Sequence, residues 1–168
     1  QFYMQTSQNM AKYQGLKTAG KDIELKYLGV YVLTVTDNST FKGILNIADT
    51  VTAVNDKTFD SSKDLVDYVN SQQLGDTVKV TYEEDGKVKS AEGKIITLEN
   101  GKNGIGIGLI DRTEVTSDVP IRFSTAGIGG PSAGLMFSLA IYTQIADPGL
   151  RNGRIVAGTG TIDRDGNV

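Results

Sequence analysis

A glycine-rich turn directly before a stretch of helical composition is the feature that most constrains this chain. Residues 127–134 have the sequence Gly-Ile-Gly-Gly-Pro-Ser-Ala-Gly, and the apolar run that overlaps and follows them, 133–144, predicts a mostly buried helix. Such a turn lets backbone approach a ligand closely, and the helix start offers unpaired N–H groups at a positive dipole end. The turn therefore predicts either a nucleophilic Ser132 beside an oxyanion-binding backbone or an ordinary serine at a helix N-terminus.

The sequence contains no histidine and no cysteine. This excludes Ser-His-Asp and thiol catalysis, and it leaves no usual zinc ligand set, so no metal is expected. A catalytic Ser132 would then need a lysine as its base. Twelve lysines occur, the last at Lys102, so none follows Ser132. Every Gly-Lys pair lacks the Ser or Thr of a phosphate-binding loop, and neither a nucleotide nor another cofactor is expected.

Composition and charge narrow the function classes further. The 168 residues are 39% hydrophobic, which suffices for one large or two small cores. A net charge of -3 with mixed signs gives no basic face for nucleic acid, and no apolar run approaches the length of a membrane span. Because the sequence begins at Gln1 without an initiator methionine, we expect it to be a fragment of a longer protein.

Hydrophobic periodicity and turn residues predict an α+β fold. We expect a helix over 1–19, a strand over 23–36, an apolar stretch over 45–54, a helix from Ser61 and Ser62 to about 74, and a hairpin of 77–82 with 88–97 around an Asp-Gly turn. The polar segment 98–104 is the predicted domain boundary. Strands are expected at 105–110, 121–124 and 155–162. The predicted division is a helical segment 1–20, a domain 21–99 and a second domain 100–168.

The first domain resembles a PDZ domain of the kind found in bacterial proteases. The resemblance covers about 24–98 and rests on the order strand, loop, Ile-Ala-Asp-Thr-Val-Thr-Ala-Val-Asn-Asp-Lys at 47–57, helix, Gly75-Asp76 and hairpin. It implies a small β-sandwich with helices, in which a peptide adds as a strand and backbone N–H groups hold its C-terminal carboxylate. The implied peptide-binding residues are Leu28, Gly29, Val30, Tyr31, Val32 and Val66.

A structural role for the same apolar residues is the alternative. The two interpretations of Val66 are evenly balanced, because Leu65 and Val69 compete with it for the inward face of the helix. The loop Tyr27-Leu28-Gly29-Val30 also departs from the commoner Gly-Leu-Gly-Phe form. This departure bears on carboxylate capture rather than on strand addition.

The second domain is similar to Lon-type serine proteases. Residues 120–134, Pro-Ile-Arg-Phe-Ser-Thr-Ala-Gly-Ile-Gly-Gly-Pro-Ser-Ala-Gly, resemble the nucleophile segment, and 157–162 with 165–168 resemble the strand and turn that lead to the catalytic lysine. The resemblance implies that Ser132 is the nucleophile of a Ser-Lys dyad and that Thr159 could hydrogen-bond the lysine. For Thr159, an ordinary strand residue is the alternative. The chain as printed would be the N-terminal part of the proteolytic domain, with little or no peptidase activity.

The order of the two domains points to one branch of this family. With no nucleotide-binding motif, and with Gly129 where many ATP-dependent members have an acidic residue, the chain resembles the membrane-anchored, ATP-independent PDZ and Lon-type proteases of Gram-positive bacteria. The resemblance implies a serine endopeptidase on the extracytoplasmic face of the membrane, held by an anchor that precedes this sequence.

The implied partners are polypeptide substrates and peptide C-termini, and a homo-oligomer stays open. The expected substrates are exported or unfolded polypeptides, which the PDZ unit recruits or gates. A non-catalytic PDZ scaffold module is the main alternative, and a non-proteolytic acyl transferase with the same dyad ranks last. The residues that follow Val168 in the gene would separate enzyme from module.

Overall fold

The computed structural model describes residues 1–125 and 130–168, and these form two compact units. One unit is Tyr27–Arg112, and the other combines Gln1–Lys26 with Thr113–Val168. This differs from the division expected from the sequence. The N-terminal helix joins the C-terminal part of the chain because α1 (Phe2–Thr18) packs against α3 (Gly134–Ile145), and the sheet unit runs past the expected boundary at 98–104.

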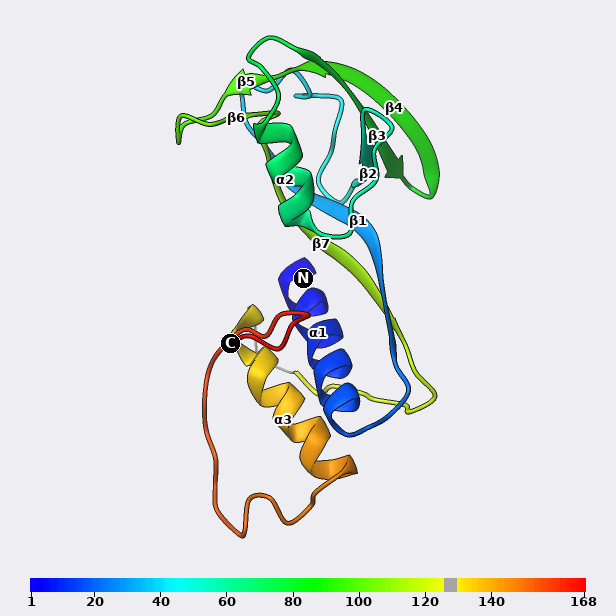
Figure 1. Ribbon diagram of the computed structural model, residues 1–168, viewed down its shortest axis with the longest axis vertical. Coiled ribbons are helices and arrows are strands. Elements are labelled where there is room, and N and C mark those ends of the chain that lie inside the picture. The colour runs from blue at the N-terminus through cyan, green and yellow to red at the C-terminus, as the bar shows by residue number, and fades with distance from the viewer. Residues whose placement is uncertain (126–129) are drawn as a thin grey trace. The chain divides into compact units, whose positions relative to one another are not determined.

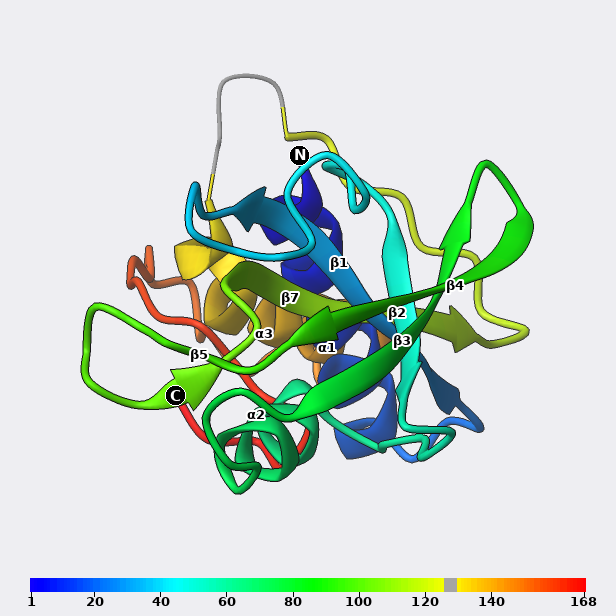
Figure 2. The same cartoon turned by 90° about the horizontal axis from the view of Figure 1, so that it is seen from above.

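The unit Tyr27–Arg112 is built on a five-stranded sheet (Figures 1 and 2). Its strands lie in the order β4-β3-β2-β1-β7, and a separate two-stranded sheet pairs β5 with β6. The strands are β1 (Glu24–Val35), β2 (Thr50–Val54), β3 (Thr77–Glu84), β4 (Lys87–Lys94), β5 (Ile96–Thr97), β6 (Asn103–Gly104) and β7 (Ile107–Thr116). The strand expected at 105–110 therefore corresponds to the start of β7, most of which lies in this unit.

The hairpin of β3 and β4 follows from its turn residues. Asp85 and Gly86 both have positive φ, at 49° and 76°, as a tight two-residue hairpin turn requires. The pairing continues without interruption from Glu84 opposite Lys87 to Thr77 opposite Lys94. The Asp-Gly prediction is confirmed.

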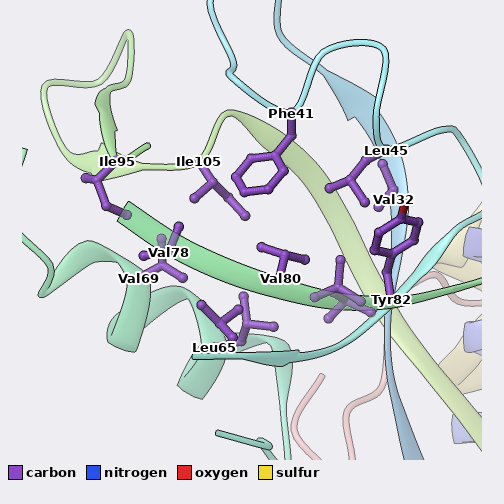
Figure 3. Close-up of a cluster of buried hydrophobic side chains, with 13 residues drawn as sticks. Val32, Phe41, Leu45, Leu65, Val69, Val78, Val80, Tyr82, Ile95 and Ile105 are labelled. Carbon is purple, nitrogen blue, oxygen red and sulfur yellow. The ribbon is translucent and has the colours of Figure 1, made fainter. Parts of the chain in front are cut away.

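Helix α2 (Ser62–Asn70) covers the core of this unit. The side chain of Ser61 accepts a hydrogen bond from the Asp64 backbone N–H, so the predicted cap is confirmed. Its two buried residues, Leu65 and Val69, reach toward Val78 and Val80 of β3 (Figure 3). The helix ends four residues earlier than expected, where the hydroxyl of Ser71 donates to the Tyr68 carbonyl at 2.6 Å.

The other unit is organised by the pair α1 and α3, which lie side by side in Figure 1. Gly15 of α1 lies so close to α3 that an added Cβ would be 2.8 Å from Cβ of Ile141. A short helix, η1 (Pro131–Ala133), leads into α3. The segments 121–124 and 155–162, expected as strands, are not strands in this structure. Among the described residues, no helix has both the length and the apolar character that a membrane crossing needs.

Candidate functional site

The edge of β7 that faces away from β1 is not covered by another strand of the described residues. Helix α2 lies beside it, and the two elements enclose an apolar groove of about 120 Å³. Leu65, Val66 and Val69 line it from α2. Ile105 lines it from the segment that enters β7, and Ile107 and Leu109 line it from β7 itself. The groove thus combines an unpaired sheet edge with apolar walls.

The turn that leads into β7 has the sequence Gly104-Ile105-Gly106-Ile107. Gly106 has a φ of +74°, a conformation that favours glycine, and a Cβ there would lie 2.5 Å from Oγ1 of Thr36. The carbonyls of Ile105 and Gly106 accept hydrogen bonds from the Ser39 hydroxyl and the Thr36 N–H. Because both carbonyls are engaged with residues 36 and 39, the backbone N–H groups of the turn are the atoms that it can offer to an anion.

Two hydrogen bonds fix α2 along this strand. At one end, Nδ2 of Asn103 donates to the carbonyl of Gln72, just after α2, at 2.8 Å. At the other, the N–H of Ser62 donates to Oδ1 of Asp111 at 2.8 Å. The helix therefore runs antiparallel to β7, and the groove has a glycine-turn end and an Asp111 end.

Most of the predicted peptide-binding residues lie in β1 instead of this groove. Val30 and Val32 are fully buried in the core, and β1 is flanked by β2 and β7, so neither of its edges is open to a peptide. Gly29 allows close contact within the sheet: its φ is +129°, and a Cβ would lie 2.3 Å from the Val51 carbonyl oxygen. Val30 and Val32 therefore have the core-forming role that was the alternative to peptide binding.

The remaining predicted residues have mixed surroundings. Leu28 and Tyr31 are half-buried, and the Arg112 guanidinium lies 5.4 Å from the centre of the Tyr31 ring. Val66 is 36% exposed and lines the α2 side of the groove. Of the predicted set, Val66 is the residue that the structure brings to the uncovered strand.

Sequence reasoning missed the segment Gly104–Ile107. Its signal was present, because Gly-Ile-Gly-Ile repeats the alternation of glycine and apolar residues of the Gly-Leu-Gly-Phe form. The neighbouring stretch 98–104 is rich in glycine and asparagine, which favoured a domain boundary there. The structure shows instead that β5, β6 and the start of β7 continue the same unit.

A half-buried tyrosine lies near the Asp111 end of the groove. The hydroxyl of Tyr27, in β1, is buried and has no hydrogen-bond partner among the described residues. Burial raises the pKa of Tyr27, and the carboxylates of Asp111, Asp64 and Asp60 raise it further. The phenol therefore stays neutral. In the described part of the chain, no three acidic residues are grouped so that they could hold a metal ion.

Ser132 lies in η1, at the point where the chain enters α3. Gly130 has a φ of 86°, Pro131 opens the helical turn, and the Ser132 side chain is exposed. The Ser7 hydroxyl, from α1, donates to the carbonyl of Pro131 at 3.0 Å. Gly127, Ile128 and Gly129 of the predicted turn lie outside the described residues. The described part of the turn places an exposed hydroxyl beside the N-terminal end of a helix.

Thr159 lies beside Ser132, although its contact is with the backbone. Its hydroxyl donates to the Ser132 carbonyl at 3.3 Å, and the N–H of Gly160 donates to the same carbonyl at 2.8 Å. The Leu135 N–H in turn donates to the Gly160 carbonyl at 3.1 Å. The segment around 160 thus supports the start of α3. A hydrogen bond from Thr159 to a catalytic lysine stays a prediction.

Comparison with known proteins places the sheet unit in context. A family model described as PDZ domain matches residues 4–95. The PDZ domain of the SdrC-like protein from Listeria monocytogenes is 35% identical, with 52% of this chain and 93% of that chain covered at a TM-score of 0.49. The corresponding domain from Listeria innocua is 38% identical, with 48% and 92% covered at 0.46. A protein from Geobacillus thermodenitrificans is 32% identical, with 48% and 94% covered at 0.43. No curated protein matches the chain.

Proposed function

The chain belongs to the PDZ domain family, and on this premise we propose that the groove between α2 and β7 binds the C-terminal segment of an extended polypeptide. The uncovered edge of β7 beside α2 is the observation that carries this proposal. A segment that pairs with such an edge gains main-chain hydrogen bonds, while alternate side chains enter the groove. Peptide binding at this edge needs no rearrangement of β1.

In the proposed complex, the glycine turn before β7 binds the C-terminal carboxylate of the peptide. The positive φ of Gly106 and the bonds that hold the Ile105 and Gly106 carbonyls favour presentation of backbone N–H groups at this point. A carboxylate bound there would sit beside the apolar groove. The last side chain of the peptide would then enter the space between Val69 and Ile105, where an apolar residue is favoured.

Titration with a peptide and its C-terminally amidated twin tests the binding proposal. We expect the free acid to bind with a Kd in roughly the micromolar range. NMR shifts should centre on 104–109 and α2. Amidation should weaken binding about tenfold, because it removes a charge-assisted hydrogen-bond acceptor.

Two variants separate the groove from the rest of the surface. Val66→Asp places a charge in the groove at a residue that is already 36% exposed and should weaken binding, whereas Val88→Asp, in β4 and 74% exposed, should not. Shifts confined to β1, or equal effects of the two variants, would remove the support for this groove. Equal binding of acid and amide would overturn carboxylate capture and leave strand addition.

We further propose that Ser132 is the nucleophile of an ATP-independent serine endopeptidase. In this proposal the groove either delivers substrate to Ser132 or controls the access of substrate to it. What favours this second function is the exposed Ser132 hydroxyl at a Gly-Pro turn that enters a helix. The unpaired N–H groups at such a helix start can stabilise an oxyanion. By the family resemblance, the base is a lysine, the substrates are exported or unfolded polypeptides, and the site of action is the extracytoplasmic face of a Gram-positive membrane.

Reaction of Ser132 with a fluorophosphonate and cleavage of an unfolded secreted polypeptide test this function. The gene sequence after Val168 gives an independent check: a Gly-Gly segment followed by a lysine supports the endopeptidase, and a stop codon supports a non-catalytic PDZ module. If the gene continues, its full product should cleave the polypeptide, and Ser132→Ala should abolish cleavage. Cleavage that survives Ser132→Ala excludes this nucleophile.

A further inference from the structure

Asn70 brings a polar side chain to the otherwise apolar groove between α2 and β7. It is the last residue of α2, and glycine and aliphatic residues form the rest of the lining. Among the described residues that line this groove, none carries a charge. The selectivity of the groove for a polar group on a peptide therefore depends on backbone atoms and on the Asn70 amide.

Asn70 lies at the glycine-turn end of the groove. Helix α2 contacts β6, which ends at Gly104, where the turn begins (Figure 1). The hydrogen bond from Asn103 to the Gln72 carbonyl fixes the end of α2 beside this turn. Because Asn70 is two residues before Gln72 and lines the same groove as Gly106, its half-buried side chain is close to the proposed position of the peptide carboxylate.

The spacing of Asn70 and Val66 sets which part of a peptide each residue meets. The two are four residues apart, so they lie one turn apart on the same face of α2, and both line the groove. A peptide whose carboxylate is at the glycine turn has its C-terminus beside Asn70, and its preceding residues extend toward Val66. Asn70 is therefore placed to contact the carboxylate, and Val66 to contact a side chain.

The other side-chain amides at this end are already engaged. Nε2 of Gln72 donates to the Tyr68 carbonyl at 3.0 Å, and Nδ2 of Asn103 donates to the Gln72 carbonyl at 2.8 Å. Within the described residues, the Asn70 side chain makes no such bond. Its two N–H donors are therefore available to a ligand in the groove.

A carboxylate accepts several hydrogen bonds at once, and its transfer from water is costly unless its oxygens find donors. Backbone N–H groups of the glycine turn supply some of these donors in the proposed complex. Resting on the proposed peptide function of the groove, we propose that Asn70 binds the C-terminal carboxylate of the peptide, with its side-chain amide donating to an oxygen that the turn leaves unpaired. The groove then recognises a free C-terminus without a lysine or arginine in its lining.

A fluorescent peptide with an apolar C-terminal residue, as free acid and as amide, tests the inference on the full chain. Asn70→Leu keeps a side chain of similar size without donors, and it should reduce the expected tenfold preference for the acid to about twofold. The affinity for the amidated peptide should change less than about twofold, because that peptide has no carboxylate to lose. Asn70→Gln retains the amide group and should keep more than half of the preference.

A charge at the same position gives a sharper test. Asn70→Asp places a carboxylate beside that of the peptide, so at neutral pH the variant should bind the amidated peptide more tightly than the acid. Gln73→Glu is the matched control, because it makes the same change from amide to carboxylate three residues later, at an exposed residue that does not line the groove. It should keep the preference of the parent chain for the acid.

The outcomes distinguish this inference from the function on which it rests. If neither peptide binds the parent chain, the groove itself is overturned. If the parent chain binds both equally, carboxylate capture is overturned and strand addition stays. Equal weakening of acid and amide in Asn70→Leu would assign Asn70 to the peptide main chain or to the groove wall and overturn the inference. Equal effects of Asn70→Asp and Gln73→Glu would reflect the net charge of the protein and also overturn it.

Discussion

Ser62 and Asp111 connect the start of α2 to the middle of β7, through a hydrogen bond of 2.8 Å from the Ser62 backbone N–H to the Asp111 carboxylate. The bond satisfies one of the N–H groups that a helix start leaves unpaired, and the negative charge favours the positive end of the helix dipole. The position of the start of α2 beside β7 therefore depends on a side chain of β7, the strand proposed to receive the peptide.

Asp111→Ala should loosen the first turn of α2. We expect a loss of about 1–2 kcal/mol in the free energy of opening of α2, because the Ser62 N–H loses its acceptor. Amide hydrogen exchange in α2, compared with exchange in β3, measures this locally. Asp111→Asn keeps an oxygen acceptor and should lose less than half as much. If Asp111→Ala leaves exchange in α2 unchanged, the bond does not hold the helix.

Gly29 and Gly43 form a matched pair for testing the close contact in the sheet. Both have positive φ, +129° and +78°, but a Cβ at Gly29 would lie 2.3 Å from the Val51 carbonyl oxygen, whereas nothing lies within 4 Å at Gly43. Gly43→Ala should cost about 1 kcal/mol for backbone strain alone. Gly29→Ala should cost at least about 3 kcal/mol because the backbone of β2 must also move.

Urea unfolding followed by a probe in β2 or β3 gives both values. Equal costs would show that the contact between Gly29 and Val51 relaxes without penalty. If Gly29→Ala also loses peptide binding, we expect the cause to be unfolding rather than a blocked groove, because Gly29 lies in β1 and does not line the groove. Thermal stability measured on the same sample separates the two.

Local sequence signals predicted the elements of the fold better than their assembly. The turn of Asp85 and Gly86 and the cap at Ser61 were predictable because each depends on residues adjacent in the chain. The packing of α1 on α3 was not, since it joins Gly15 to Ile141 across more than a hundred residues, and no local pattern encodes that contact. The extension of the sheet unit past 98–104 also depends on contacts between residues far apart in the chain, so it could not be predicted from local patterns.

The candidate site was predicted in part for a related reason. The periodicity of the helix left the two interpretations of Val66 evenly balanced, and the structure places Val66 on the groove. The role of Ser132, which rests on a turn that is local in sequence, stays a prediction. Which strand receives the peptide depends on strand order, and Val30 and Val32 have the same apolar alternation whether they face a ligand or the core. The alternation at Ile105 and Ile107 acquires its meaning only once β7 is known to be the edge strand.

Tyr27→Phe should stabilise the sheet unit. The Tyr27 hydroxyl is buried with no partner among the described residues, so its removal should raise the free energy of unfolding by about 0.5–2 kcal/mol near neutral pH. Urea unfolding of the variant beside the parent chain measures the difference. A clear loss of stability would show that the hydroxyl makes a favourable bond, for instance to a water molecule.

The same variant should change the response to alkali. The folded pKa of Tyr27 is raised by burial and by three carboxylates, so below about pH 10 the phenol is neutral in both folded and unfolded chains. As the pH rises above that value, the unfolded chain loses its proton first, and the folded state loses stability. Stability measured between pH 9 and 11 should therefore fall more steeply in the parent chain than in Tyr27→Phe. Parallel curves would contradict the raised pKa.

Ser7→Ala should disturb the turn that carries Ser132, although Ser7 is remote from it in sequence. The Ser7 hydroxyl donates to the Pro131 carbonyl at 3.0 Å, and this hydrogen bond links α1 to the start of η1. Without the hydroxyl the carbonyl loses a partner, at a cost of about 1 kcal/mol. Ser138→Ala is the matched control, because Ser138 is as buried as Ser7 but its hydroxyl donates, within the described residues, to the Gly134 carbonyl of its own helix. Hydrogen exchange of the Leu135 amide, which donates to the Gly160 carbonyl, should accelerate about fivefold in Ser7→Ala and stay unchanged in the control.

Where Ser132 reacts with a fluorophosphonate, Ser7→Ala should slow that reaction and Ser138→Ala should not. Equal behaviour of the two variants in exchange would assign Ser7 a role in helix packing alone.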